Sequence, residues 1–241
     1  MSGTDFGALD AVGLNLQAVF DLDDLPDHLR DRLLNTTDSP PGLRQLILIG
    51  NAGPTLWRSV CASDIDSNDP IDAFSVREAN RWLDQHCPGH TQHRLYPGHA
   101  PVDLQQLGQL AGWHHASPFK LGIQPGWGTW FAYRVALLAD TALPGTAPRH
   151  TTSPCLGCID SPCVRSCPAG AMADGDFALD ACIDYRQRPD SRCADTCVAR
   201  LHCPVGEANR YDTAQIRHVY SNSLRMIARY RATAEQRSPE A

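Results

Sequence analysis

Two cysteine-rich stretches decide the fold: CLGCIDSPCVRSCP at residues 155–168 and CADTCVARLHCP at residues 193–204. Together with Cys182 they hold eight of the ten cysteines in a chain of 241 residues, and each stretch ends in Cys-Pro. Met1 to Phe6 lacks the charged and apolar regions of a secretory signal, so we expect a cytoplasmic protein with reduced thiols. Reduced thiols at this density indicate metal binding rather than disulfides.

The cysteine spacing predicts iron–sulfur clusters. The run C-x2-C-x4-C-x3-C-P that begins at Cys155 is close to the bacterial ferredoxin run, with two extra residues before the third cysteine. In two-cluster ferredoxins the fourth cysteine of each run binds the other cluster. We therefore expect two [4Fe–4S] clusters, one on Cys155, Cys158, Cys163 and Cys203, the other on Cys167, Cys182, Cys193 and Cys197. The alternative is a pair of four-cysteine zinc sites, which would stabilise the fold without redox activity.

The composition is that of a globular protein of one or two domains, with 42% hydrophobic and 20% charged residues. No apolar run approaches the length of a membrane span. The net charge of −6 argues against a nucleic-acid scaffold. The one lysine, Lys120, lies in no Gly-rich phosphate loop, which excludes P-loop enzymes and leaves Schiff-base chemistry without support.

Hydrophobic periodicity predicts an α+β arrangement before the cysteines. Helices are expected over 24–34, over 70–85 and from Pro101, and strands over 45–49, 119–124 and 129–138, with a turn at 125–128. After the cysteines, residues 213–236 are predicted to form an amphipathic helix that docks onto the body of the protein.

Two polar features of the first 150 residues require partners. Arg134 lies inside a predicted strand, so its guanidinium should meet an anion or an acceptor unless it reaches solvent. Four residues of a Pro/Gly-rich loop could bind zinc, although their sequence is more typical of a turn. These are His86, Cys87, His90 and His93.

Several segments resemble two related families. The stretches LGQLAGW (107–113) and GTWFAYR (128–134), with Leu143-Pro144-Gly145, resemble the CblC-type cobalamin-processing proteins. The cysteine region instead resembles epoxyqueuosine reductase and the reductive dehalogenases, in which a cobalamin domain precedes two [4Fe–4S] clusters. The segment 182–185 and Cys203-Pro204 are similar to the second-cluster region of epoxyqueuosine reductase.

The resemblance implies three parts. Residues 1–150 would form a nitroreductase-like (CblC-like) sheet-and-helix domain that holds cobalamin base-off, with FMN or no cofactor as the alternative. Residues 151–212 would form a bacterial-ferredoxin-like two-cluster module, and 213–241 a C-terminal docking helix and tail.

The resemblance also implies a cofactor pocket, with Arg134 as its catalytic residue. Its cofactor-binding residues would be Val102, Asp103, Leu104, Gln105, His114, His115, Ala116, Gly122, Tyr133 and Arg134. The two histidines could ligate cobalt or only line the pocket. Gly126 and Gly128 would let the backbone approach the macrocycle closely.

The implied function is an oxidoreductase in which the clusters pass electrons to a corrinoid, either to reduce cobalamin or to remove its upper ligand. One alternative is a cobalamin-dependent reductase of an organic substrate such as a halide or a tRNA base. Another is a non-enzymatic electron-transfer ferredoxin with a partner-binding domain. Gly98 stands where epoxyqueuosine reductase has an acidic proton donor, so a substrate reductase would need Asp103, Tyr96, Tyr133 or a histidine instead. The electrons would come from a flavodoxin, a ferredoxin or a reductase.

Overall fold

The computed structural model describes residues 4–35, 39–147 and 149–237 and has a mixed α/β architecture. The chain divides into two compact units. Unit 1 comprises Met1–His114 and Trp130–Thr151, and unit 2 comprises His115–Thr129 and Thr152–Ala241. Residues 115–129, which we expected in the first domain, therefore belong with the cysteines, and so does the C-terminal helix.

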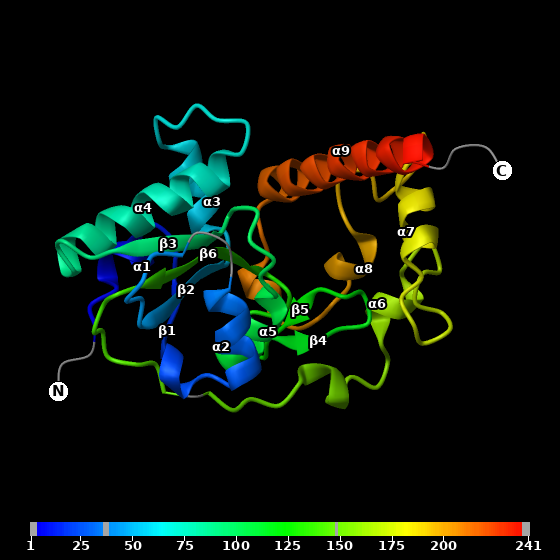
Figure 1. Cartoon of the computed structure of the whole chain (residues 1–241). Coiled ribbons are helices and arrows are strands. Elements are labelled where there is room, and N and C mark those ends of the chain that lie inside the picture. Colours follow the sequence, from blue (N-terminus) through cyan, green and yellow to red (C-terminus); the bar gives the residue numbers. More distant parts are fainter. Residues whose placement is uncertain (1–3, 36–38, 148, 238–241) are drawn as a thin grey trace. The chain divides into compact units, whose positions relative to one another are not determined.

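Unit 1 is built on a four-stranded antiparallel sheet (Figure 1). Its strand order is β1 (Leu16–Asp21), β2 (Gln45–Ala52), β6 (Phe131–Ala139) and β3 (Gln92–Tyr96). Every residue of β2 is buried, and so are most of β6. Central strands with this pattern are covered on both faces, which places the core of unit 1 around β2 and β6.

The helices of unit 1 are short except for one. They are α1 (Gly7–Ala11), α2 (Asp27–Leu34), α3 (Thr55–Cys61), α4 (Pro70–His86) and α5 (Leu104–Leu110), with a 3-10 turn, η1, at Leu22–Asp24. Helix α4 packs on β6 and buries Phe74, Trp82 and Leu83. Asp72 lies in its first turn.

Unit 2 consists of short elements and one long helix. A small hairpin, β4 (His115–Ala116) with β5 (Gly122–Ile123), precedes η2 (Pro154–Gly157), α6 (Pro162–Arg165), α7 (Leu179–Arg186), α8 (Val198–Leu201), η3 (Glu207–Asn209) and α9 (Thr213–Arg237). Its hydrophobic core joins Phe119, Met172 and Ala199 to cysteine side chains.

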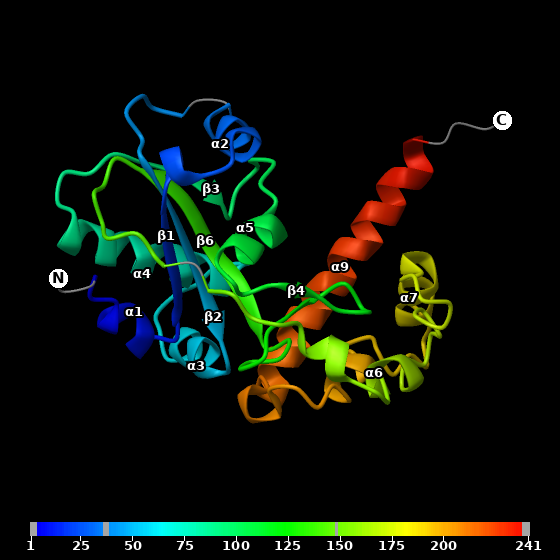
Figure 2. The same cartoon turned by 90° about the horizontal axis from the view of Figure 1, so that it is seen from below.

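Helix α9 confirms the predicted C-terminal helix, and it packs against the cysteine region of its own unit (Figure 2). Arg217 forms an ion pair with Asp195 at 3.3 Å, and Arg231 pairs with Asp184 of α7.

Among the helices that the structure describes, none has both the length and the apolar character needed to cross a bilayer.

Two glycines explain why residues 115–129 belong to unit 2. Gly128 has φ +59°, and a Cβ placed there would lie 1.9 Å from the carbonyl oxygen of Val205. Gly206 has φ +69°, and its Cβ would lie 2.2 Å from the backbone of Trp127. The two backbones therefore approach more closely than any other residue type allows. The expectation that Gly128 makes room for a macrocycle is wrong, because Val205 fills that space. At Gly126 the space that a Cβ would take is bordered by the Gln124 side chain.

Other local predictions need correction as well. The helix expected from Asp24 begins only at Asp27, because residues 22–24 form the 3-10 turn and Pro26 precedes the helix. Residues 119–124 form a strand only at Gly122–Ile123, although the predicted turn after it closes through hydrogen bonds between Gln124 and Gly128. Strands β1 and β3 were not predicted.

Candidate metal centres

Unit 2 brings Cys203 beside the cysteines of the first stretch. Cys155 lies in η2, Cys163 in α6 and Cys203 just after α8. Burial raises the pKa of the Cys155 thiol, and the neighbouring Cys203 and Cys158 raise it further. The pKa of Cys163 is likewise raised, by burial first and then by Cys203. We call Cys155, Cys158, Cys163 and Cys203 the first quartet.

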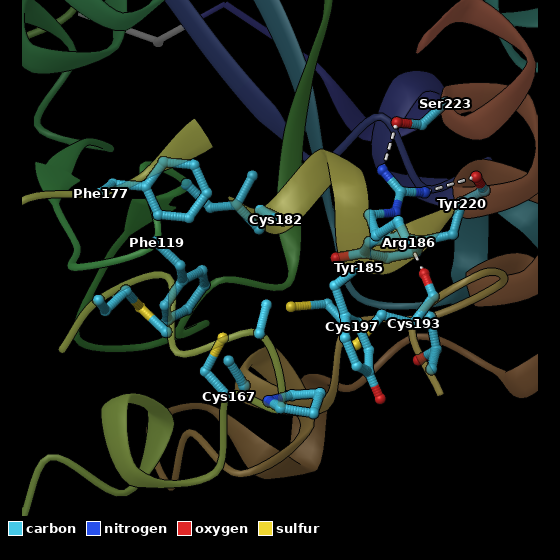
Figure 3. Close-up of a pocket in the computed structure, with 16 residues that line it drawn as sticks. Phe119, Cys167, Phe177, Cys182, Tyr185, Arg186, Cys193, Cys197, Tyr220 and Ser223 are labelled. Atoms are coloured by element: carbon cyan, nitrogen blue, oxygen red, sulfur yellow. Dashed lines mark hydrogen bonds between the residues drawn. The ribbon is translucent and has the colours of Figure 1, made fainter. Parts of the chain in front are cut away.

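The second quartet, Cys167, Cys182, Cys193 and Cys197, surrounds a cavity of about 200 Å³ (Figure 3). Burial raises the pKa of Cys182 to about 11, with further contributions from Cys197, Cys167 and Cys193. Phe119, Met172 and Phe177 also line this cavity. Cys167 therefore lines the same cavity as three later cysteines, and the binding of a cluster by this quartet stays a prediction.

The raised pKa values mean that burial disfavours the thiolate form that a metal ligand requires. Each thiol must lose its proton to become a ligand. The positive charge of an assembled metal centre stabilises the thiolates and offsets the cost of burying them. In residues 4–35, 39–147 and 149–237, no three His, Cys, Asp or Glu side chains converge closely enough to hold one metal ion. The donor set fits a four-iron cluster, in which the four thiolates bind separate iron atoms and need not converge on one.

Two polar side chains adjoin the second quartet (Figure 3). Arg186 of α7 donates hydrogen bonds to the Cys193 carbonyl at 3.1 Å, the Ser223 hydroxyl at 3.1 Å and the Tyr220 carbonyl at 2.9 Å. The side chain of Tyr220 hydrogen-bonds to Cys197 and lowers its pKa, against the larger effect of burial. Neither residue was singled out in this role by the sequence, because both contacts depend on how α9 packs.

The other cysteines and the histidine loop belong to unit 1, whereas both quartets belong to unit 2. Cys61 is exposed at the end of α3, and Cys87 follows α4 in unit 1. His86 Nδ1 lies 2.8 Å from the Trp82 carbonyl, and His90 Nδ1 lies 2.8 Å from that of Cys87. The His90 amide also donates to the Cys87 carbonyl at 3.2 Å, which is the predicted turn, and zinc binding by this loop stays a prediction.

The residues expected to bind cobalamin are divided between the two units. Val102, Asp103, Leu104 and Gln105 lie at the start of α5 in unit 1, as do His114 of the following loop and Tyr133 and Arg134 of β6. The β4–β5 hairpin of unit 2 carries His115, Ala116 and Gly122.

Several polar groups of this set already have protein partners. The Asp103 carboxylate caps α5 by accepting a hydrogen bond from the Gln106 amide at 3.0 Å. His114 Nδ1 lies 3.0 Å from the Tyr133 hydroxyl, and burial raises the pKa of Tyr133. A Cβ on Gly108 would lie 1.9 Å from the same hydroxyl, so Gly108 is the residue that admits the tyrosine. Asp103, His114 and Tyr133 thus hold α5 and the loop after it in place.

Arg134 belongs to a second polar group within unit 1. Its Nε donates a 2.7 Å hydrogen bond to the Asn51 side chain, and the residue is 9% exposed. The prediction that Arg134 meets an acceptor is therefore confirmed. Its two terminal nitrogens make no hydrogen bond with any residue that the structure describes, and no carboxylate of that part of the chain pairs with it within 4.0 Å.

Asp72 and Tyr96 complete this Arg134 group (Asn51, Asp72, Tyr96 and Arg134). Burial raises the pKa of Asp72, and the charge of Arg134 partly opposes that rise. Burial also raises the pKa of Tyr96, as does Asp72. Neither Asp72 nor Asn51 was a predicted site residue. Only the pairing of β2 with β6 and the packing of α4 on β6 bring them to Arg134.

Comparison with known proteins shows which solved structures share this fold. No family model matches the chain. No curated protein matches it either. Among solved structures it resembles epoxyqueuosine reductase from Streptococcus thermophilus, with a TM-score of 0.53 and 14% sequence identity over 85% of this chain and 65% of that one. It resembles an epoxyqueuosine reductase in complex with a tRNA-Tyr stem loop to a similar degree, with a TM-score of 0.52, 13% identity and coverage of 87% and 66%.

A catabolic reductive dehalogenase in complex with 3-bromo-4-hydroxybenzoic acid matches less well, with a TM-score of 0.49, 14% identity and coverage of 90% and 33%. The chain thus has the fold of epoxyqueuosine reductase and spans about two thirds of the length of those enzymes. The predicted likeness to epoxyqueuosine reductase is confirmed at the level of fold. The likeness to CblC-type proteins, and with it the nitroreductase-like description of unit 1, stays a prediction.

Proposed function

We propose that this chain is an iron–sulfur oxidoreductase in which two [4Fe–4S] clusters pass electrons to a base-off corrinoid that reduces an organic substrate. The first quartet would hold one cluster and the second quartet the other. The observation that carries the proposal is the crossed grouping of eight thiols in one unit of a chain with the epoxyqueuosine reductase fold. An external flavodoxin, ferredoxin or reductase would feed the clusters.

The corrinoid supplies low-valent cobalt chemistry when it is bound, and the protein sets access and orientation. The start of α5, His114 and Tyr133, all in unit 1, are the proposed contacts. His114 already contacts Tyr133 through Nδ1, which supports a role in shaping the pocket over cobalt ligation through that nitrogen. A base-off corrinoid without a histidine ligand is what the resemblance implies.

The Arg134 group is the proposed site of proton delivery. Reduction of an organic substrate consumes protons as well as electrons, and Gly98 offers no acidic side chain. Tyr96 was one of the predicted donors, and its pKa is raised by burial and by the charge of Asp72, whose own pKa burial also raises. Arg134 would orient a polar or anionic part of the substrate through its terminal nitrogens. Asp103 and Tyr133 are weaker candidates for the proton donor, because their side chains already hydrogen-bond to Gln106 of α5 and to His114 of the loop after it.

A second candidate function is reduction of the corrinoid itself, or reductive removal of its upper ligand. Gly98 favours this reading, because such a reaction needs no proton donor at that position. The same clusters and pocket would serve. The two functions differ in the final electron acceptor, which is an organic molecule in the first and cobalt in the second. A tRNA base is a candidate for the organic acceptor, as one structural relative is bound to a tRNA stem loop.

Titration of hydroxocobalamin and methylcobalamin into anaerobically reconstituted protein tests the proposal. We expect micromolar binding with the absorbance change of a base-off corrinoid, followed by dithionite-driven conversion of Co(II) to Co(I). Single turnover with an organohalide or with epoxyqueuosine-containing tRNA then distinguishes the two candidates. Protein that holds both clusters but binds no corrinoid would instead be an electron-transfer ferredoxin with an unassigned partner domain.

A further inference from the structure

Arg186 is a buried cation, and its hydrogen-bond partners among the described residues are all neutral. It is 8% exposed, and its three hydrogen bonds go to two backbone carbonyls and one hydroxyl, all of them neutral. In the part of the chain that the structure describes, no Asp or Glu pairs with it within 4.0 Å. Burying an arginine without a counter-charge is costly, so the negative charge should come from something this pocket holds.

The four cysteines of the second quartet adjoin Arg186, and they would become anionic thiolates on binding a cluster. Arg186 lines the same cavity as its four thiols, and its charge lowers the pKa of Cys182 and Cys193. Among the described residues, no arginine is seen to act on a thiol of the first quartet alone. Arg200 acts on Cys203 of the first quartet and on Cys197 of the second, so its charge is shared between the two.

Tyr220 connects Arg186 to the thiols. Its carbonyl accepts a hydrogen bond from Arg186, its ring lies under the guanidinium at 5.4 Å, and its side chain hydrogen-bonds to Cys197. Figure 3 shows Arg186 between Tyr220, Ser223 and Cys193 at one side of the cavity. A cation and a sulfur-directed hydrogen bond therefore adjoin the same quartet.

We propose, on the basis of the two-cluster function above, that Arg186 and Tyr220 selectively raise the reduction potential of the cluster on the second quartet. Reduction of a [4Fe–4S] cluster adds one electron and no proton, so the cluster gains one negative charge. A fixed buried cation and a hydrogen bond to a ligating sulfur both stabilise that charge. The pair thereby favours transfer of an electron from the first cluster to the second.

Redox titration of the reconstituted protein, followed by the EPR signals of the reduced clusters, tests this role with dithionite as the reductant. The second-cluster signal is identified as the one lost in Cys182→Ser. In Arg186→Gln we expect the reduced-to-oxidised ratio of that cluster at fixed potential to fall about tenfold, or about 59 mV for a one-electron couple. Tyr220→Phe should shift it in the same direction by less, and Arg186→Lys should restore most of the wild-type value.

Arg188→Gln is the matched control, because it removes the same charge from an exposed residue two positions further along the chain. Its second-cluster potential should equal that of the wild type, and the first cluster should be unchanged in every variant. Tyr220→Phe protein with both clusters and an unshifted second potential would overturn the inference, as would equal shifts of both clusters in Arg186→Lys or Arg186→Gln. Wild-type protein that assembles no cluster would overturn the proposed function instead.

Discussion

Cys203→Ser is expected to destroy the cluster of the first quartet, although Cys203 follows the second cysteine stretch in sequence. Iron should fall from about eight to about four atoms per chain, because one complete quartet remains. Cys167→Ser should remove the other cluster for the reciprocal reason. Iron analysis with EPR of the reduced protein measures both losses.

Double variants distinguish complete loss of one cluster from partial loss of both. Cys155→Ser with Cys203→Ser should retain about four irons, because both changes affect one cluster, whereas Cys167→Ser with Cys203→Ser should retain almost none. Cys61→Ser and Cys87→Ser are the controls, since both thiols lie in unit 1. Loss of the same EPR signal in Cys203→Ser and Cys182→Ser would show that the quartets do not cross.

Arg134→Ala is expected to lower substrate turnover by roughly 10- to 150-fold, which corresponds to the 1.5–3 kcal/mol or so lost with a hydrogen bond to a charged group. Steady-state rates with an organic substrate, and corrinoid affinity in the same protein, separate a turnover defect from a binding defect. Arg134→Lys should recover only part, because an ammonium cannot bond both Asn51 and a second acceptor in the same fork geometry. Unchanged turnover in Arg134→Ala would remove Arg134 from the site.

The same substitution should change the pH dependence of stability. The pKa of Asp72 is raised in the folded protein above its ordinary 3.8, so ionising Asp72 costs stability as the pH rises above that value. Arg134 reduces this cost, and its removal should make the loss of thermal stability steeper as the pH rises above about 4. Adding Asp72→Asn should abolish the extra slope. A double variant that keeps the steeper slope would mean that Asp72 is not the titrating group.

Sequence reasoning works for the parts of this protein whose structure depends on patterns within a short stretch of residues. Cysteine spacing predicts the quartets, and continuous apolar runs predict β2 and β6. Strand β1 mixes Gln17 and Asp21 with apolar residues, and β3 carries His93 and Arg94, so neither has a clean period. The placement of residues 115–129 depends on Gly128 meeting Val205, a contact between residues far apart in the chain.

The Arg134 group shows the same limit within the site. Arg134 could be expected to need an acceptor, but its identity follows from strand register. Asn51 lies opposite Ala132, next to a register shift between Ile49 and Gly50 that displaces the following pairs. Asp72 belongs to α4. Hydrophobic periodicity predicts this helix but does not show which side chains it directs toward Arg134. Contacts of this kind become visible only once the sheet is assembled.

Iron, acid-labile sulfide and zinc measured per chain in anaerobically prepared wild-type protein test the central claim most directly. The account predicts about eight iron atoms and about eight sulfides per chain, with zinc near background. Two zinc ions per chain, with no sulfide and no iron–sulfur absorbance, would contradict it and make the quartets structural sites.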